Sequence, residues 1–273
     1  MNGLELSNAL RDGRRVYGTL VTSPSPILPE WLKGVGLDFV FIDTEHIPIG
    51  RNILSWMCQT YRAMNLAPIV RIPNPDPYEA CKVLDGGAGG IVAPYVETVE
   101  EVQALIGAVK FRPLKGKKLA AALDGSSELG PRLAAYLHER NEGRLLIINI
   151  ESVPAVENLG CLLEVSGIDA VLIGPHDLSV SMEIPEEYSH PEFDQAVRSI
   201  IETVRAKGIG VGIHFWTGTE QEIDWARHGA NVIVHHGDIS LFTSALRNDL
   251  TRMREALGDR AGPAAVSRDV EPI

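Results

Sequence analysis

Short runs of β-branched and aliphatic residues alternate with longer amphipathic segments along the whole chain. The runs are continuously apolar, as expected of parallel strands that are covered on both faces. The segments between them have helical periodicity, and several end in glycine, a common residue just past a helix. The predicted strands are RVYGTLVT (15–22), DFVFID (38–43), APIVRIP (67–73), GGIVAPY (89–95), RLLIINIE (144–151), DAVLIGP (169–175), GVGIHFW (210–216) and NVIVHH (231–236).

This alternation predicts an α/β protein with one (β/α)₈ TIM barrel over residues 1–258, followed by a flexible tail over 259–273. A doubly wound open sheet is the alternative, but no G-x-G-x-x-G opens a helix after the first strand. Residues 111–143 form an insertion between strands four and five. Long loops on the mouth side of a barrel tend to be functional.

Composition narrows the range of partners. The formal net charge of −11 argues against a nucleic-acid or acidic-membrane partner, because both require a basic face. No apolar run approaches the roughly 18 residues that a membrane helix needs. The first residues contain no apolar signal-peptide core, and the three cysteines are expected to be reduced. We therefore expect a cytoplasmic protein without membrane contacts.

Two carboxylates follow consecutive predicted strands: Glu151 after the fifth and Asp177 after the sixth. Strand ends meet at the mouth of a barrel, where active sites form, and like charges that close need a cation between them. Oxygen ligands suit Mg²⁺ or Mn²⁺, with Co²⁺ as a further candidate. The alternative is that both residues cap the helices that follow.

Further candidate catalytic residues lie at the ends of strands two and three. Arg71 ends an apolar strand, where its permanent charge must meet an anion, either a substrate or a structural carboxylate. His46 follows strand two in IDTEHIP, and Asp43 is expected to orient its ring so that it can shuttle protons. Asp85 either approaches this site or caps the third helix.

Other barrel chemistries lack the residues they require. None of the seven lysines ends a strand, which argues against an aldolase that uses a Schiff base. No H-x-H lies on the first strand, which argues against a zinc hydrolase. Carbanion chemistry in this barrel would therefore rely on a metal ion.

Five ordered motifs resemble the HpcH/HpaI family of class II, metal-dependent pyruvate aldolases over residues 4–258. They are FVFIDTEHIP, PIVRIPNPDP, KVLDGGAGGIVAPYVETVEEV, INIESVPAVENL and VLIGPHDLSVSM. The resemblance implies that Glu151 and Asp177 are the metal ligands and that Arg71 holds the keto acid and its enolate. It makes His46, with Asp43, the acid/base relay.

The resemblance also implies supporting roles and an assembly. Asp85 would support the site, in one arrangement from an adjacent subunit, and the backbone from Gly174 to Asp177 would cradle the substrate carboxylate. The family implies a hexamer, a trimer of dimers, in which the C-terminal helix is exchanged between subunits.

Departures from the family pattern fall on the pocket for the second substrate. Asn149 replaces a glutamine, and His176, beside Pro175, replaces a small residue. His235 and His236 stand where the family is apolar and contains glycine. The predicted substrate-binding residues are Arg71, Asn149, Gly174, Pro175 and His176.

The favoured function is cleavage of a 4-hydroxy-2-keto acid to pyruvate, or a related 2-keto acid, and an aldehyde through a metal-stabilised enolate. One alternative is a metal-dependent lyase or hydrolase acting on an acyl-CoA ester or another dicarboxylate. A second alternative is a barrel that binds a keto acid without catalysis.

Overall fold

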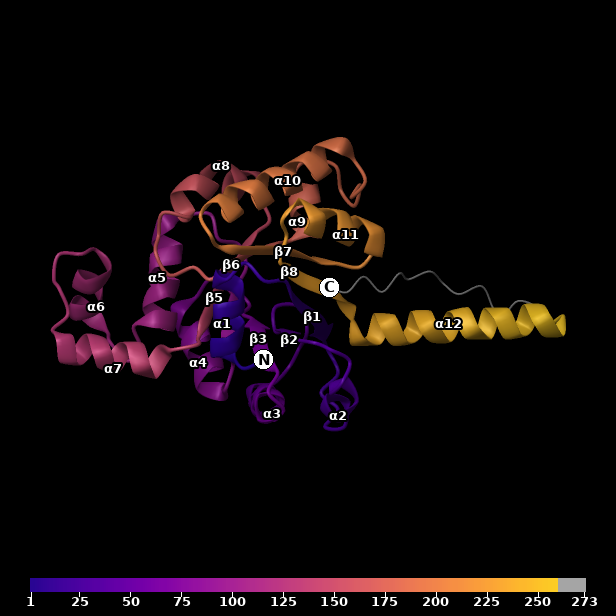
Figure 1. Ribbon diagram of the computed structural model, residues 1–273, viewed down its shortest axis with the longest axis horizontal. Helices are drawn as coiled ribbons and strands as arrows, with labels where there is room; N and C mark the ends of the chain where they lie inside the picture. Colours follow the sequence, from indigo (N-terminus) through magenta and orange to yellow (C-terminus); the bar gives the residue numbers. More distant parts are fainter. Residues whose placement is uncertain (260–273) are drawn as a thin grey trace.

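A computed structural model describes residues 1–259 as one closed barrel of eight parallel strands (Figure 1). Each strand pairs with the next along the chain, and β8 pairs with β1 to close the barrel. The strands are β1 (Val16–Val21), β2 (Phe39–Asp43), β3 (Ala67–Arg71), β4 (Gly90–Ala93), β5 (Leu145–Ile150), β6 (Ala170–Ile173), β7 (Gly210–Phe215) and β8 (Val232–Gly237). The predicted TIM barrel is confirmed, with strand ends shifted by at most two residues.

Helices form the outer layer and close one end of the barrel. They are α1 (Gly3–Arg11), α2 (Leu28–Leu32), α3 (Arg51–Ala63), α4 (Pro77–Gly86), α5 (Val99–Lys110), α6 (Gly116–Leu123), α7 (Pro131–Asn141), α8 (Val153–Leu162), α9 (Pro175–Ser181), α10 (Pro191–Ala206), α11 (Thr219–His228) and α12 (Asp238–Leu257). The segment 111–143 contains α6 and α7, which lie outside α5 (Figure 1). Residues 260–273, the greater part of the predicted tail, lie outside the described residues.

Alternate positions along the strands fill the barrel interior. Phe39 and Phe41 of β2 belong to an interior apolar cluster that continues into Leu6 and Leu10 of α1, while Val40 packs outward beneath the helices. Because side chains alternate along a strand, the next inward positions lie at the open end of the barrel. At that end the inward side chains become polar, and they form the candidate site.

Helix α12 departs from the compact layer. It extends away from the barrel, and none of its twenty residues is buried (Figure 1). Within residues 1–259, no helix combines the length and apolarity needed to cross a lipid bilayer.

Candidate active site

A buried ion pair joins the ends of β2 and β3. Asp43 and Arg71 are register partners, so their side chains point the same way from neighbouring strands. Arg71 Nε donates to Asp43 Oδ1 at 2.8 Å, and Arg71 Nη2 donates to Oδ2 at 2.7 Å. Asp43 is fully buried, and Arg71 is 8% exposed above the Phe41 ring. This two-pronged pairing fixes the direction of the guanidinium group.

The structure corrects the expected role of Asp43 toward His46. Asp43 does not orient the His46 ring: its oxygens accept from Arg71 and from the backbone N–H groups of Glu45 and His46. The carboxylate that pairs with the ring is that of Glu45, whose Oε2 lies 3.6 Å from His46 Nε2 and 3.1 Å from Arg71 Nε. Burial raises the pKa of Glu45, and the Arg71 charge opposes that shift. Glu45 was not among the site residues predicted from the sequence.

Glu151 follows β5 and is only 4% exposed. Its Oε1 accepts from the Tyr95 backbone N–H at 2.7 Å, and its Oε2 accepts from Asn149 Nδ2 at 2.8 Å. Tyr95 holds a left-handed backbone conformation with φ of 53°, a cost that this contact helps to offset. A Cβ at Gly174 would lie 2.4 Å from Glu151 Oε2, so the carboxylate requires glycine there. Tyr95 was missed from the sequence, since a backbone donor leaves no residue-type signal.

The Glu151 and Asp177 carboxylates are close enough to repel each other. Burial raises the pKa of Glu151 to about 7, and the Asp177 charge adds to the rise. Asp177 is half-buried in the first turn of α9. Neither residue is a helix N-cap, because Ser152 holds that position in α8 and Gly174 holds it in α9, which rules out the capping alternative.

This pair fits a divalent cation with few protein ligands. Two carboxylates that repel each other gain from a cation between them, and oxygen is the ligand that Mg²⁺ and Mn²⁺ prefer. Within residues 1–259, no group of three or more His, Cys, Asp or Glu side chains is arranged to hold a metal ion. A site built from Glu151 and Asp177 would therefore leave coordination positions for substrate oxygens and water.

One cavity of about 280 Å³ collects most of the predicted site residues at the barrel mouth. The predicted residues that line it are His46, Arg71, Asn149, Gly174, Pro175, His176 and Asp177. Phe41, His214 and Trp216 also line it, and none of these three was among the site residues predicted from the sequence. A substrate of a few carbon atoms fits the space that the cavity offers.

His214 is a buried, neutral imidazole in the cavity wall. Its Nε2 lies 3.0 Å from the His236 carbonyl oxygen, which can only accept, so Nε2 carries the proton. Burial lowers the pKa of His214 to about 4, and the Arg71 charge lowers it further. The ring packs edge-on against Phe41 and Trp216, with centroids 5.6 and 5.4 Å away.

The neutral His214 predicts a loss of stability in acid. Between its usual value of about 6.5 and its folded value of about 4, the unfolded chain binds a proton that the folded chain excludes. Stability should therefore fall as the pH drops through this window, by up to about 3 kcal/mol from this ring alone. Glutamine in the variant His214→Gln can still donate a hydrogen bond, but it does not titrate. The free energy of unfolding of this variant, measured in urea, should therefore fall less between pH 7 and pH 4 than that of the wild type.

The exposed ring of His138 provides the control. His138→Gln should follow the wild-type pH dependence over the same range. Equal slopes for wild type and His214→Gln would show that His214 is protonated in the folded protein.

Asp43 and Glu151 do not line the cavity but bond to Arg71 and Asn149, which do, whereas Asp85, His235 and His236 lie away from it. Asp85 is in the last turn of α4, at the opposite end of the barrel, where its side chain is 67% exposed and pairs with Arg112. A contribution of Asp85 to an adjacent subunit stays a prediction. The His235 side chain binds Glu222 at 2.6 Å on the outside of β8, and the His236 ring lies 3.3 Å from Ser240. Strand alternation explains the outward direction of His235, whereas His236 has a left-handed backbone conformation with φ of 50°, which interrupts the alternation.

Most of the chain matches a known protein family. Residues 17–245 match the sequence model of the HpcH/HpaI aldolase/citrate lyase family. A 2-keto-3-deoxy-L-rhamnonate aldolase of Salmonella gallinarum is 32% identical over 260 residues, which cover 93% of this chain and 96% of the relative.

Solved structures show the same architecture. An HpcH/HpaI aldolase/citrate lyase family protein of Burkholderia cenocepacia superposes with a TM-score of 0.78 and 25% identity, covering 92% of this chain and 99% of that one. The citrate synthase SbnG superposes with a TM-score of 0.79 and 28% identity, covering 93% and 99%. The expected class of enzyme, a carbon–carbon lyase, is confirmed by the family and the aldolase relatives. The chain belongs to the HpcH/HpaI aldolase/citrate lyase family.

Proposed function

We propose that this enzyme is a divalent-metal-dependent aldolase that cleaves a 4-hydroxy-2-keto acid to pyruvate, or a related 2-keto acid, and an aldehyde. The observation that carries the proposal is the arrangement at the barrel mouth: a rigidly held Arg71 and Asp177 line one cavity, and Glu151 accepts a hydrogen bond from Asn149 in the cavity wall. Relatives named 2-keto-3-deoxy-L-rhamnonate aldolase support a substrate of this type.

Glu151 and Asp177 would hold Mg²⁺ or Mn²⁺, with Co²⁺ as a further candidate. When bound, such a cation polarises a carbonyl group and stabilises negative charge on its oxygen. Arg71 supplies a fixed positive charge in the same cavity, and Asp43 and Glu45 prevent it from swinging away. Because the positive charge is already in place, the site needs little reorganisation as the enolate forms.

His46 is placed for proton transfer at the rim of the cavity. Its side chain is 33% exposed, and its Nε2 lies 3.6 Å from Glu45 Oε2. In the cleavage direction His46 accepts the proton of the 4-hydroxyl group, and the C3–C4 bond breaks to release the aldehyde. The bonding electrons pass into the enolate, and protonation at C3 then gives the keto acid.

The test is exchange of the methyl protons of pyruvate in D₂O, which requires the enolate but no aldehyde. With Mg²⁺ or Mn²⁺ the enzyme should accelerate this exchange, measured by NMR, far above the rate with metal ion alone. Exchange no faster than in the enzyme-free control would remove the basis of the proposal, including the alternative reactions that share the enolate.

The cavity also favours a neutral, hydroxylated aldehyde. Asn149 Oδ1 and His176 Nδ1 are buried without a hydrogen-bond partner, and the neutral His214 adds an acceptor nitrogen. These acceptor atoms can accept hydrogen bonds from the hydroxyl groups of a substrate. Among the described residues, Arg71 is the only lysine or arginine lining the cavity, and two carboxylates already neutralise it. This pattern weighs against an acyl-CoA ester or a second dicarboxylate.

We further propose that the enzyme is a homo-oligomer, a hexamer built as a trimer of dimers, in which α12 is exchanged between subunits. Apolar side chains recur along α12 at spacings of three and four and are 38–66% exposed: Phe242, Leu246, Leu250 and Met253. Beside α11 and the outer face of β8, a cavity of about 450 Å³ lined by Tyr17, Ile223 and Ile233 stands uncovered. A helix following β8 would normally cover this face, so α12 of a second copy is its natural occupant.

Disrupting the apolar stripe of α12 should dissociate the assembly. Leu246→Glu combined with Leu250→Glu places two charges where the partner barrel would bury apolar surface. Light scattering after gel filtration should show the wild type as a hexamer and the variant at a lower mass. Asn248→Glu with Thr251→Glu adds the same charge on another face of α12 and should leave the mass unchanged. An unchanged mass for the leucine variant would contradict helix exchange.

A further inference from the structure

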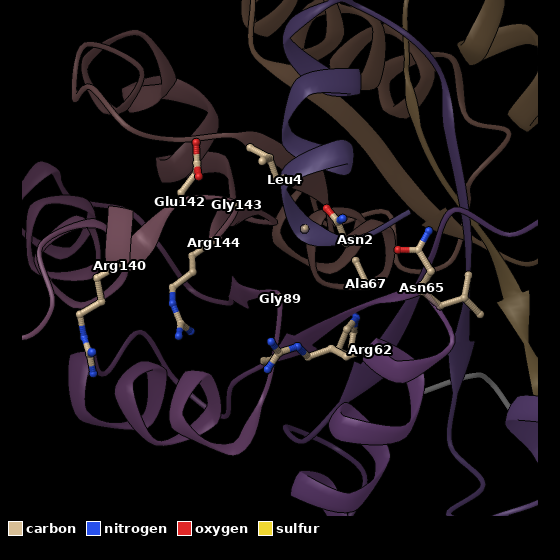
Figure 2. Close-up of a pocket in the computed structure, with 14 residues that line it drawn as sticks. Asn2, Leu4, Arg62, Asn65, Ala67, Gly89, Arg140, Glu142, Gly143 and Arg144 are labelled. Carbon is tan, nitrogen blue, oxygen red and sulfur yellow. The ribbon is translucent and has the colours of Figure 1, made fainter. Parts of the chain in front are cut away.

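A second cavity, of about 540 Å³, lies at the end of the barrel opposite the mouth. It is bounded by the beginnings of β3, β4 and β5 and by the first turn of α1. Figure 2 shows Arg62 of α3, Arg140 of α7 and Arg144 before β5 directed into one region of this cavity. No residue that lines it also lines the mouth cavity. The two cavities are therefore separate.

The positive charge around this second cavity is poorly neutralised. Of the described residues that line it, only Glu142 carries a carboxylate, against three guanidinium groups. Arg112 lines a neighbouring cavity that shares Arg140, and its charge reaches Arg144, although Asp85 pairs with it. Burial lowers the pKa of Arg144, and the charges of Arg112, Arg62 and Arg140 lower it further. Such a concentration of positive charge is unexpected in a chain whose net charge is −11.

The arginines retain unused hydrogen-bonding capacity. Arg112 Nη1 is buried without a partner, although the same guanidinium binds Asp85 through Nη2. Arg144 Nη1 has only a neutral acceptor, the Leu84 carbonyl oxygen at 3.2 Å. Because guanidinium groups bind carboxylates and phosphates in two-pronged fashion, an anion with several oxygens would satisfy them best.

Backbone rather than side chains forms part of the cavity wall. Gly3 and Gly143 pack so closely that a Cβ at Gly3 would lie 2.2 Å from the Gly143 carbonyl oxygen. Gly143 has φ of 72°, a conformation that disfavours other residues. No bulky side chain from this wall fills the space between the arginines.

We propose that this arginine cavity, lined by Arg62, Arg140 and Arg144, binds a small polyanion that carries phosphate or several carboxylates. The ligand places its oxygens between the guanidinium groups and neutralises their mutual repulsion. The site is independent of the aldol chemistry, since it lies at the other end of the barrel.

Calorimetric titration of the metal-free, full-length protein with inorganic pyrophosphate and with citrate tests the proposal and separates the two sources of charge. At least one probe should bind once per chain, and saturating pyruvate should not displace it. Arg62→Gln combined with Arg144→Gln should weaken binding tenfold or more. Arg132→Gln, an equal charge change at an exposed position of α7, should bind as the wild type does.

Four results would overturn the proposal: no saturable binding of either probe, displacement by pyruvate, equal loss in Arg132→Gln, or unchanged binding in the double variant. Arg62 is exposed, so Arg62→Gln alone provides a folded variant if the double variant is unstable. A double variant with altered oligomeric mass, together with a wild type that binds neither probe, would instead identify the surface as a subunit contact. Pyruvate proton exchange should stay unchanged throughout, which separates this test from that of the aldolase function.

Discussion

Replacing Arg71 by lysine is expected to lower the rate of aldol cleavage by about two to three orders of magnitude. Lysine retains the charge but has a single donor group, so it cannot reproduce the fork that binds both oxygens of Asp43. The positive charge would then be mobile at the point where enolate charge develops. The measurements are kcat/KM for a 4-hydroxy-2-keto acid and the rate of pyruvate proton exchange, both of which should fall.

Arg71→Ala should combine this loss with instability. Asp43 is fully buried, and removing its partner leaves an unpaired charge, which costs about 3–5 kcal/mol in buried pairs. Arg198→Lys is the matched control, because Arg198 pairs with Asp194 and Asp224 near the surface. It should leave the rates unaltered. Arg71→Lys with rates within threefold of the wild type would exclude the assigned role.

The fold was accessible from the sequence because parallel strands leave a strong local signal. Each strand is apolar on both faces, and the helices between them carry their own periodicity. Barrel closure then places strand ends together, so that Arg71 and Asp177 could be assigned to one mouth from their positions, and the family resemblance added Asn149 and Gly174. The structure collects them in one cavity.

The hydrogen-bond and ion-pair partners of each side chain were harder to predict from the sequence. Asp43 was expected to orient His46, because the two are close in sequence. The register of β2 with β3 instead places Asp43 beside Arg71, and the two side chains form an ion pair. The Tyr95 N–H that binds Glu151 depends on a left-handed backbone conformation that side-chain patterns do not reveal. The arginine cavity is lined by residues from four segments of the chain, near positions 3, 65, 89 and 142, so no single sequence motif predicts it.

Replacing Glu151 by glutamine should abolish metal-dependent catalysis while preserving the fold. The amide retains the shape of the side chain and an acceptor for the Tyr95 N–H, but it removes one of two carboxylates available to the cation. Pyruvate proton exchange should fall by about three orders of magnitude at a Mg²⁺ or Mn²⁺ concentration that saturates the wild type, in line with a lost contribution of several kcal/mol from the ion.

The stability of the same variant should separate this role from a structural one. A ligand that binds only the folded state raises the unfolding temperature, so Mn²⁺ should stabilise the wild type and not Glu151→Gln. Without metal the variant should unfold at or above the wild-type temperature, because burial disfavours the charged carboxylate and raises its pKa to about 7. Glu97→Gln, the same change at an exposed position near the mouth, should respond to Mn²⁺ as the wild type does. If the Glu151→Gln variant is less stable than the wild type without metal, yet is still stabilised by Mn²⁺, then Glu151 has a structural role and other residues bind the cation.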